Sequence, residues 1–415
     1  MNPATGAARV AAPPVRPVLG AAVASITLAL LLGLQALTTD MYLPALPMLA
    51  AELRAPMPAV QLTMSALIMG FGLSQLAWGP VADRFGRRPV LLAGLALHML
   101  SALGAALAPH IEAVVAWRAL QGVGMSASVV CARAMLRDLY EPYEGAHVMS
   151  RALTGLGLLA IAAPLAGGVL ATWAGWRSTM GALSIFGLGL LAYVAWRVPE
   201  TIRACNLRAT QVGPLLRQMR CTFAHPTFRA WTLLVCFAYG GLMVFLAGSS
   251  FVLIRGLGLS TWQCGLAMAA GSGSYVIGTI ICRFLLRRYG LAGAVVRGAG
   301  FTALACVLML VLGASGTMSV WAVLLPQCLF ALGHGVHQPC GQAGAVSPFP
   351  HAAGVASALA GFALALAGMA VSTWLGAMLV GTEPRTYFFT QATLAALTVL
   401  VAWTLVRRHG ELPRA

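Results

Sequence analysis

The stretch GPVADRFGRRPVL, from Gly79 to Leu91, is a charged turn between two long apolar runs. It combines one acid and three arginines with glycines that permit a tight turn. A related stretch, GTIICRFLLRRYGL from Gly278 to Leu291, recurs in the second half of the chain. Both stretches give Arg-Phe, then Arg-Arg, then an apolar run. The chain is therefore predicted to contain two related halves.

The composition identifies the class of protein. Hydrophobic residues make up 60% of the 415 residues and charged residues 9%, whereas a soluble domain carries about 25% charged residues. Many apolar runs reach the roughly 20 residues that a helix needs to cross a hydrocarbon core. The alternating polarity of membrane β-strands is absent, so only helices are plausible spanning elements. The expected fold class is an all-α membrane protein.

Charged, Pro-rich and Gly-rich stretches divide the chain into twelve expected spans. The first six cover residues 18–47, 59–82, 88–108, 112–137, 147–172 and 176–198. The second six cover residues 229–253, 261–286, 291–313, 317–343, 351–379 and 385–408. The expected domains are an N-terminal segment (1–17), a six-helix bundle (18–198), a polar linker (199–228), a second six-helix bundle (229–408) and a tail (409–415).

The arginines set the expected orientation. All basic residues are Arg, the net charge is +16, and nearly all of these residues fall in alternate connections. Because cytoplasmic loops accumulate Arg, we expect both termini to be cytoplasmic and the linker to lie on the same side. The basic charge then reflects topology, so nucleic-acid binding is not expected. The nine Cys show no metal-ligand spacing, and no metal site is predicted.

Asp40 is the one acid inside a predicted span. It lies in LTTDMYLPALP (Leu37 to Pro47), while the other nine acids fall at or beyond span ends. A carboxylate within a membrane costs at least about 2.5 kcal/mol unless it faces a cavity or a partner. We hypothesise that Asp40 takes up and releases a coupling proton. The alternative is that it lies at the outer interface, or caps a helix broken by Pro44 and Pro47.

Arg118, in WRALQGVGMSAS (Trp117 to Ser128), is the one cation within a predicted span. A permanently charged guanidinium there should seek a carboxylate or backbone carbonyls. Asp40 is the expected partner, directly or through water, and Gln121 lies three residues away on the same helix face to orient the guanidinium. The alternative is an interfacial Arg118 that extends outward to water.

The charged turn is expected to act as a conformational gate. Asp83 is expected to pair with Arg87 or Arg133, and Asp138 to meet the same cluster, so that breaking these pairs shifts a conformational equilibrium. The alternative is that the arginines only fix topology and Asp83 caps a helix. The full set of gate residues is Gly79, Asp83, Arg84, Gly86, Arg87, Arg88, Arg133 and Asp138.

Two further groups of residues are candidates for function. APLAGG, from Ala163 to Gly168, places Pro164, Gly167 and Gly168 within a span, which allows a kink and close helix approach. The candidate substrate cavity comprises Asp40, Tyr42, Gln121, Tyr239, Phe245 and Gln338. Ordinary helix packing is the alternative for its uncharged members. His334 and His337 are expected to be structural.

These motifs together resemble the major facilitator superfamily, and within it the Bcr/CflA subfamily of multidrug resistance transporters. The matching stretches are TDMYLPALP, GPVADRFGRRPVLLAG, RALQGVGMSASVVCARAMLRDL, APLAGG and AGVASALAGF (Ala353 to Phe362). The resemblance implies a major facilitator fold with two six-helix bundles. It also implies a gate at the charged turn, proton transfer at Arg118, Gln121 and Gly122, and an antiporter motif at Pro164, Gly167 and Gly168. Two departures are Ala163, where the antiporter motif usually has Gly, and Cys282, where the second charged turn lacks an Asp.

The implied function is drug:proton antiport across the bacterial cytoplasmic membrane by alternating access. The expected partners are a small-molecule substrate, protons and membrane lipid, and the protein is expected to act as a monomer. No cofactor beyond the proton motive force is expected. The alternative is a proton-coupled exporter of an endogenous metabolite such as an amino acid or siderophore. An enzyme is not expected, because the sequence lacks HExxH and paired carboxylates within the spans.

Overall fold

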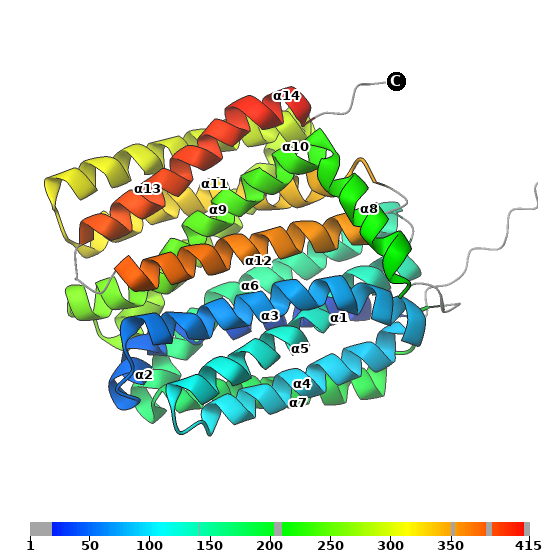
Figure 1. Ribbon diagram of the computed structural model, residues 1–415, viewed down its shortest axis with the longest axis horizontal. Coiled ribbons are helices and arrows are strands. Elements are labelled where there is room, and N and C mark those ends of the chain that lie inside the picture. The colour runs from blue at the N-terminus through cyan, green and yellow to red at the C-terminus, as the bar shows by residue number, and fades with distance from the viewer. Residues whose placement is uncertain (1–18, 141, 203–209, 350–352, 379–383, 411–415) are drawn as a thin grey trace, which may run out of the picture.

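The computed structural model describes residues 19–140, 142–202, 210–349, 353–378 and 384–410. Long helices running side by side make up most of this part of the chain, which contains no strand (Figure 1). The first half comprises α1 (Ala21–Asp40), η1 (Leu43–Ala45), α2 (Leu46–Glu52), α3 (Met57–Phe85), α4 (Arg87–Ala106), α5 (Ile111–Leu139), α6 (Pro142–Ala174) and α7 (Trp176–Arg197).

The second half begins after a short helix, α8 (Val212–Ala224). It comprises α9 (Pro226–Ser250), η2 (Phe251–Gly256), α10 (Thr261–Ser315), α11 (Val320–Val346), α12 (Ala353–Met378), α13 (Pro384–Val401), η4 (Ala402–Val406) and α14 (Arg407–His409). The sequence analysis treated residues 199–228 as a polar connection and did not predict α8.

The longest helix, α10, accounts for two membrane crossings. Its 55 residues would extend about 80 Å as one rod, more than twice the roughly 30 Å of a hydrocarbon core. At Gly290 the backbone leaves the helical region, with φ 69° and ψ −173°, a conformation that only glycine adopts readily. The break falls between the predicted spans 261–286 and 291–313.

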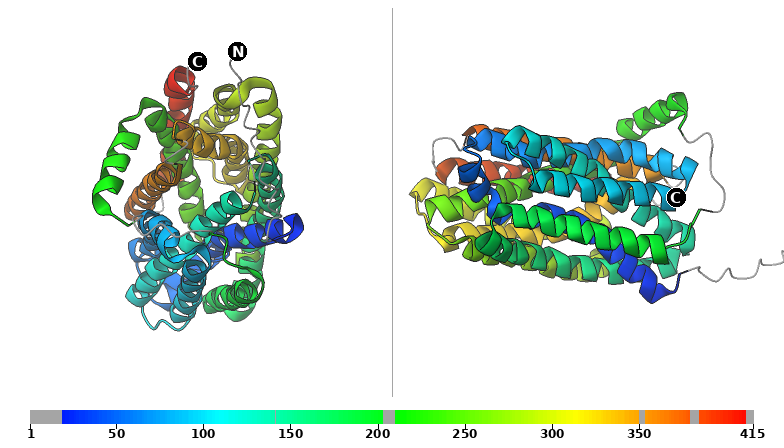
Figure 2. Two further views of the ribbon diagram at one scale, coloured as in Figure 1. Left: turned by 90° about the vertical axis from the view of Figure 1, so that its right-hand side faces the viewer. Right: turned by 90° about the horizontal axis from the view of Figure 1, so that it is seen from below.

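The predicted fold class is confirmed. Eleven helical stretches in the described residues are long and apolar enough to cross a membrane, and division of α10 at Gly290 makes twelve crossings. The first stretch runs from Ala21 to Glu52, since η1 and α2 continue α1. An even number of crossings places the start of α1 and the end of α14 at the same end of the molecule (Figure 2).

Two helix pairs join the halves, and small residues bring their backbones together. Along α3 and α12, a Cβ added at Gly72 would collide with Ala365. Along α6 and α10, a Cβ added at Gly265 would lie 2.6 Å from the carbonyl oxygen of Pro164. In membranes, where apolar burial does not drive helix association, such close packing stabilises the contact.

The apolar cores differ between the two ends of the bundle. At the end where α2 lies, one cluster includes buried residues of both halves, among them Tyr42, Phe245 and Phe388. We call the other end, where α3, α5 and α7 end and α4 begins, the arginine-rich end; there each half has its own cluster. The apolar packing between the halves is therefore concentrated at the end opposite the arginines.

Candidate proton-coupling and substrate site

Asp40 is the last residue of α1, inside the first span. The chain leaves the α-helix there because Pro44 and Pro47, which lack backbone N–H groups, begin η1 and α2. The Asp40 carboxylate accepts a hydrogen bond from Thr39 Oγ1 at 2.8 Å. Among the described residues it has no ion pair. The span continues for twelve residues beyond Asp40, to Glu52, so the acid lies within the span and not at its outer end.

Arg118, on α5, is fully buried. Its guanidinium donates to the Thr38 carbonyl oxygen at 3.2 and 3.3 Å, and to Gln121 Oε1 at 2.8 Å. It also contacts Met64 Sδ at 3.5 Å and lies 4.5 Å from the centre of the Tyr42 ring. Arg118 therefore joins α1, α3 and α5, and the alternative in which it extends to water is wrong. The expected orienting role of Gln121 agrees with this geometry.

The expected direct pair between Arg118 and Asp40 is not present. Arg118 instead binds the carbonyl of Thr38, two residues before Asp40. The Thr38 carbonyl lies in the last turn of α1, where helical carbonyls lose their intrahelical partners.

His98, on α4, belongs to the same buried polar cluster and was missed by the sequence analysis. Its Nε2 lies 2.9 Å from Thr38 Oγ1. The Thr38 hydroxyl also donates to the Leu34 carbonyl at 2.6 Å. Gln121 Nε2 lies 3.4 Å from the same ring nitrogen. A single His in an apolar run gives no sequence signal of this contact, because its partners lie on other helices.

The two tyrosines of the predicted cavity approach the cluster from opposite halves. Tyr42 is fully buried, and its hydroxyl lies 3.0 Å from Thr63 Oγ1. Tyr239, on α9, packs with Ile68 and Met243 and is close enough to Asp40 for electrostatic interaction. Asp40 therefore lies where the first half faces the second.

The remaining two cavity candidates, Phe245 and Gln338, both belong to the second half. Phe245 is 2% exposed and packs in the apolar core shared by both halves, which agrees with ordinary helix packing. Gln338, on α11, is half-buried, and its Oε1 has no hydrogen-bond partner in the described part of the chain.

The APLAGG motif lies against both Asp40 and the second half. A Cβ added at Gly167 would collide with the carbonyl oxygen of Met41, the residue after Asp40. A Cβ at Gly168 would lie 3.0 Å from the Thr261 carbonyl oxygen on α10. Pro164 lies inside α6 without ending it. The two glycines let α6 pack closely on α1 and on α10 at the level of the acid.

The charged turn forms an ion-pair cluster at the arginine-rich end. Arg87 pairs with Asp83 at 2.6 Å and with Asp138 at 3.1 Å, and Thr201 Oγ1 donates to Asp138 at 3.2 Å. The expected pairing of Asp83 with Arg87 and the expected contact of Asp138 with the cluster are therefore present. The cluster ties α3, α4 and α5 to the segment after α7.

Glu200 is a second residue that the sequence analysis did not assign. Its carboxylate accepts four backbone N–H bonds of 2.8–3.0 Å, from Arg87, Arg88, Thr201 and Ile202. Burial alone would raise the pKa of Glu200, but these N–H donors lower the pKa below its ordinary value. Gly86 has φ 101°, and a Cβ there would lie 2.5 Å from a Glu200 oxygen.

The other gate candidates point in different directions. Arg84 donates to Thr210 Oγ1 at 2.8 Å, and Arg88 to the Ala195 carbonyl at 2.7 Å. A Cβ added at Gly79 would meet open space.

Arg133 does not join the ion-pair cluster, where it was an expected partner of Asp83. It crosses to the second half, where it donates to Ser357 Oγ and Gln342 Oε1, each at 3.3 Å. These two bonds link α5 to α12 and α11 at the arginine-rich end. The arginine reaches the second half because it lies on the face of α5 away from Arg87.

Histidines of the second half are buried in an aromatic setting. His334 stacks on Phe330 at 6.3 Å between ring centres and lies 5.6 Å from the Tyr275 ring, and His337 is fully buried. No group of three or more His, Cys, Asp or Glu suited to a metal occurs among the described residues.

Comparisons with known proteins match most of the chain. Residues 28–372 match the Major Facilitator Superfamily. Multidrug resistance protein D of Escherichia coli is 32% identical over 383 residues, covering 91% of this chain and 94% of that protein. A chloramphenicol resistance protein of Pseudomonas aeruginosa is 29% identical, covering 85% and 82%. A bicyclomycin resistance protein homolog of Haemophilus influenzae is 26% identical, covering 92% and 96%.

Solved structures show the same fold. A D-xylose-proton symporter superposes with a TM-score of 0.73 at 18% identity, over 92% of this chain and 97% of that one. A bacterial homolog of the human lysosomal transporter Spinster, in an inward-facing occupied conformation, gives 0.68 at 14% identity, over 92% and 95%.

Proposed function

Because the chain belongs to the major facilitator superfamily, we propose that it exports drugs or other small amphiphilic compounds in exchange for protons. The chain is a multi-pass membrane transporter and not an enzyme. Its relatives, named for multidrug, chloramphenicol and bicyclomycin resistance, are of the Bcr/CflA type. Their names support drugs as the substrate class, and an acid within a spanning segment supports the proton as the coupling ion.

One observation carries the proposal: the half-buried acid and the buried cation within the spans of the first half do not pair with each other. Asp40 has a single hydrogen bond, from Thr39, and no cation partner in the described residues. Arg118 is bound only by uncharged groups. A neutral Asp40 avoids the cost of an unpaired carboxylate in the membrane, which supports Asp40 as the group that takes up and releases the proton.

The proposed cycle is alternating access. A substrate enters from the cytoplasm or inner leaflet, displaces the proton of Asp40 and leaves to the outside, where Asp40 is protonated again. Because the proton and the substrate weaken each other's binding, the effect is reciprocal. The proton gradient supplies about 1.4 kcal/mol per pH unit and about 2.3 kcal/mol per 100 mV when net charge moves.

The orientation follows from the arginines. We place the arginine-rich end in the cytoplasm of a bacterial cell and the protein in its cytoplasmic membrane, with both termini inside. One chain contributes both halves of the site, so we propose that a monomer is functional and that no cofactor is required beyond the proton motive force.

The test is transport into inverted membrane vesicles with an acidic lumen. We expect radiolabelled chloramphenicol, or another drug for which a relative is named, to accumulate in vesicles that contain the protein. A protonophore should abolish the accumulation, and vesicles without the protein provide the background.

Drug accumulation that persists after the protonophore has collapsed the gradient would overturn proton coupling. If no drug accumulates but amino acids or siderophores do so in a gradient-dependent way, the protein is a metabolite exporter and not a drug exporter.

A further inference from the structure

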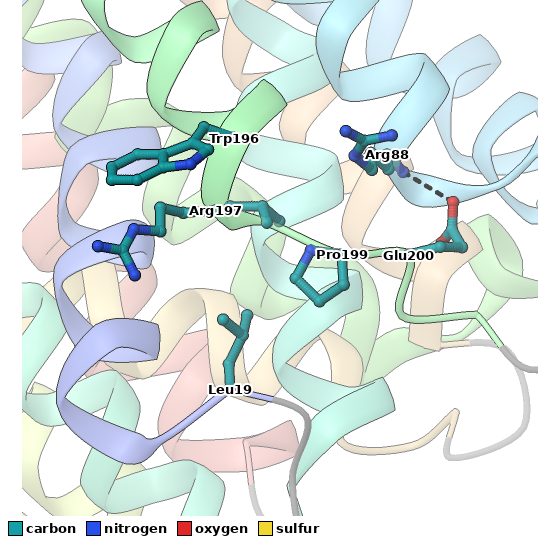
Figure 3. Close-up of a pocket in the computed structure, with 7 residues that line it drawn as sticks. Leu19, Arg88, Trp196, Arg197, Pro199 and Glu200 are labelled. Carbon is teal, nitrogen blue, oxygen red and sulfur yellow. Dashed lines mark hydrogen bonds between the residues drawn. The ribbon is translucent and has the colours of Figure 1, made fainter.

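A pocket at the arginine-rich end lies outside the transport site. It has a volume of about 350 Å³ and is lined by the start of α1, the start of α4, the end of α7 and the segment that follows, through Leu19, Arg88, Trp196, Arg197, Val198, Pro199 and Glu200 (Figure 3). This volume is at the lower end of the range of small-molecule sites. The pocket opens where three spanning segments reach the membrane boundary.

The two arginines of the pocket have no acid partner among the described residues. The Arg88 side chain donates one bond, to the Ala195 carbonyl, and its Nε is buried without a partner among the described residues. Arg197 is exposed, and its guanidinium lies 4.0 Å from the centre of the Trp196 ring. Figure 3 shows Arg197 between Trp196 and Leu19, with Arg88 on the other side of the segment that leads to Glu200.

The one acid in the lining does not neutralise these arginines. Both carboxylate oxygens of Glu200 accept backbone N–H bonds: Oε1 from Arg87, Thr201 and Ile202, and Oε2 from Arg88. With two guanidinium groups and one carboxylate, the pocket carries a net positive charge and has donors available for an anion.

The rest of the lining is apolar, and its most exposed side chain is Trp196. Trp196 is 76% exposed although it lies in the last turn of a spanning helix, the position at which tryptophans meet the membrane–water boundary. Leu19, Val198 and Pro199 add apolar surface. A ligand that satisfies this lining has an anionic head and an apolar body.

We propose that this pocket binds the head group of an anionic phospholipid of the phosphatidylglycerol class. The phosphate lies against Arg197, with Arg88 adding positive potential, and the glycerol and upper acyl chain lie on Trp196 and Leu19. Basic pockets between spanning helices on the cytoplasmic side suit such head groups. The proposal rests on the orientation given above but not on the transported substrate or on proton coupling.

The test is lipid binding to the purified full-length protein in detergent, measured by native mass spectrometry. Phosphatidylglycerol or phosphatidylcholine is titrated separately. We expect the wild type to prefer phosphatidylglycerol and Arg197→Gln to bind it about fivefold more weakly, which corresponds to about 1 kcal/mol for one arginine near an anionic head group. Arg197→Lys should retain most of the preference, since it retains the charge.

Arg151 is an exposed arginine of α6 outside the pocket. The variant Arg151→Gln is therefore the matched control and should bind phosphatidylglycerol like the wild type. Equal binding of the two lipids by the wild type, or an unchanged preference in Arg197→Gln, would overturn the proposal. Displacement of phosphatidylglycerol by millimolar inorganic phosphate would also overturn it, because the ligand would then be a free phosphate. Each outcome is independent of whether the protein transports drugs.

Discussion

Arg118 places a full positive charge in the interior of the first half, and every group that contacts it there is uncharged. Its partners are a backbone carbonyl, an amide oxygen, a thioether and an aromatic face. This arrangement uses the planar fork and the flat face of a guanidinium together, which an ammonium group cannot do. The guanidinium is held in place without an ion pair among the described residues.

Arg118→Lys tests that geometry. A lysine keeps the charge but cannot bind Thr38 and Gln121 while stacking on Tyr42. Since a charged hydrogen bond contributes about 1.5–3 kcal/mol, we expect gradient-driven drug uptake in vesicles to fall tenfold or more. Arg151→Lys, on the exposed face of α6, should transport normally. If Arg118→Lys has the wild-type elution profile and unfolding temperature and also transports like the wild type, the guanidinium geometry of Arg118 is not required for transport.

The stability of the folded protein should depend on pH through the ionisation of Glu200. The N–H bonds to its carboxylate lower its pKa in the folded protein, whereas in the unfolded chain the pKa is about 4.3. Above that value the bonds contribute fully, and as the pH falls through the lower folded value their contribution is lost. The wild type should therefore unfold at a higher temperature than Glu200→Gln at pH 7, and the difference should shrink below about pH 4.

The matched control is Glu112→Gln, whose side chain is 81% exposed. Thermal unfolding of the purified proteins across this pH range measures the effect. A difference between wild type and Glu200→Gln that stayed constant down to pH 3 would show that the ionised carboxylate is not what the N–H groups recognise.

At the scale of elements, the turn between α3 and α4 depends on a single backbone conformation. Gly86 has φ 101°, and the Glu200 carboxylate occupies the space that a Cβ would need. Glu200 can bind the first N–H groups of α4 only because the chain turns there without a side chain. The charged turn thus joins α3, α4 and the end of α7 into one rigid unit.

Gly86→Ala should destabilise the protein by about 1–3 kcal/mol, the cost of a strained backbone conformation. Gly79→Ala, in the same motif, should be neutral or stabilising by up to about 1 kcal/mol, because Gly79 lies inside α3 with open space around it. Unfolding temperatures of the two variants provide the comparison. Equal effects would mean that both motif glycines serve only as helix residues.

The sequence predicted the long elements well and the contacts between them less well. Long apolar runs with Arg at alternate ends allow few structures other than spanning helices, so the twelve crossings were predictable, including the break in α10. The 13-residue α8 was not, because it is too short and too charged to stand out from a loop. The partners of Arg118 and the role of His98 depend on which helix faces meet, and spacing within one helix does not give that.

At the scale of the whole molecule, the two halves are joined differently at their two ends. The end opposite the arginines has a shared apolar core, while at the arginine-rich end Arg133 bridges to Gln342 and Ser357. Hydrogen bonds of this kind can break without exposing a large apolar surface. The arginine-rich end is therefore the side where the halves can separate at the lower cost.

Arg133→Ala should loosen that end. Loss of charged hydrogen bonds of about 1.5 kcal/mol predicts roughly tenfold faster amide hydrogen exchange in the adjoining ends of α5, α11 and α12. Arg137→Ala, an exposed arginine one turn further along α5, should leave those rates unchanged. Unaltered exchange in Arg133→Ala would show that its bonds do not hold the halves together.

Drug-induced proton release is the most direct test of Asp40 as the coupling acid. Inverted vesicles with an acidic lumen are followed with a pH-sensitive dye while a transported drug is added. We expect the drug to release protons from wild-type vesicles, and Asp40→Asn to bind the drug but release none. Proton release by Asp40→Asn equal to that of the wild type would contradict the assignment of Asp40 as the coupling acid.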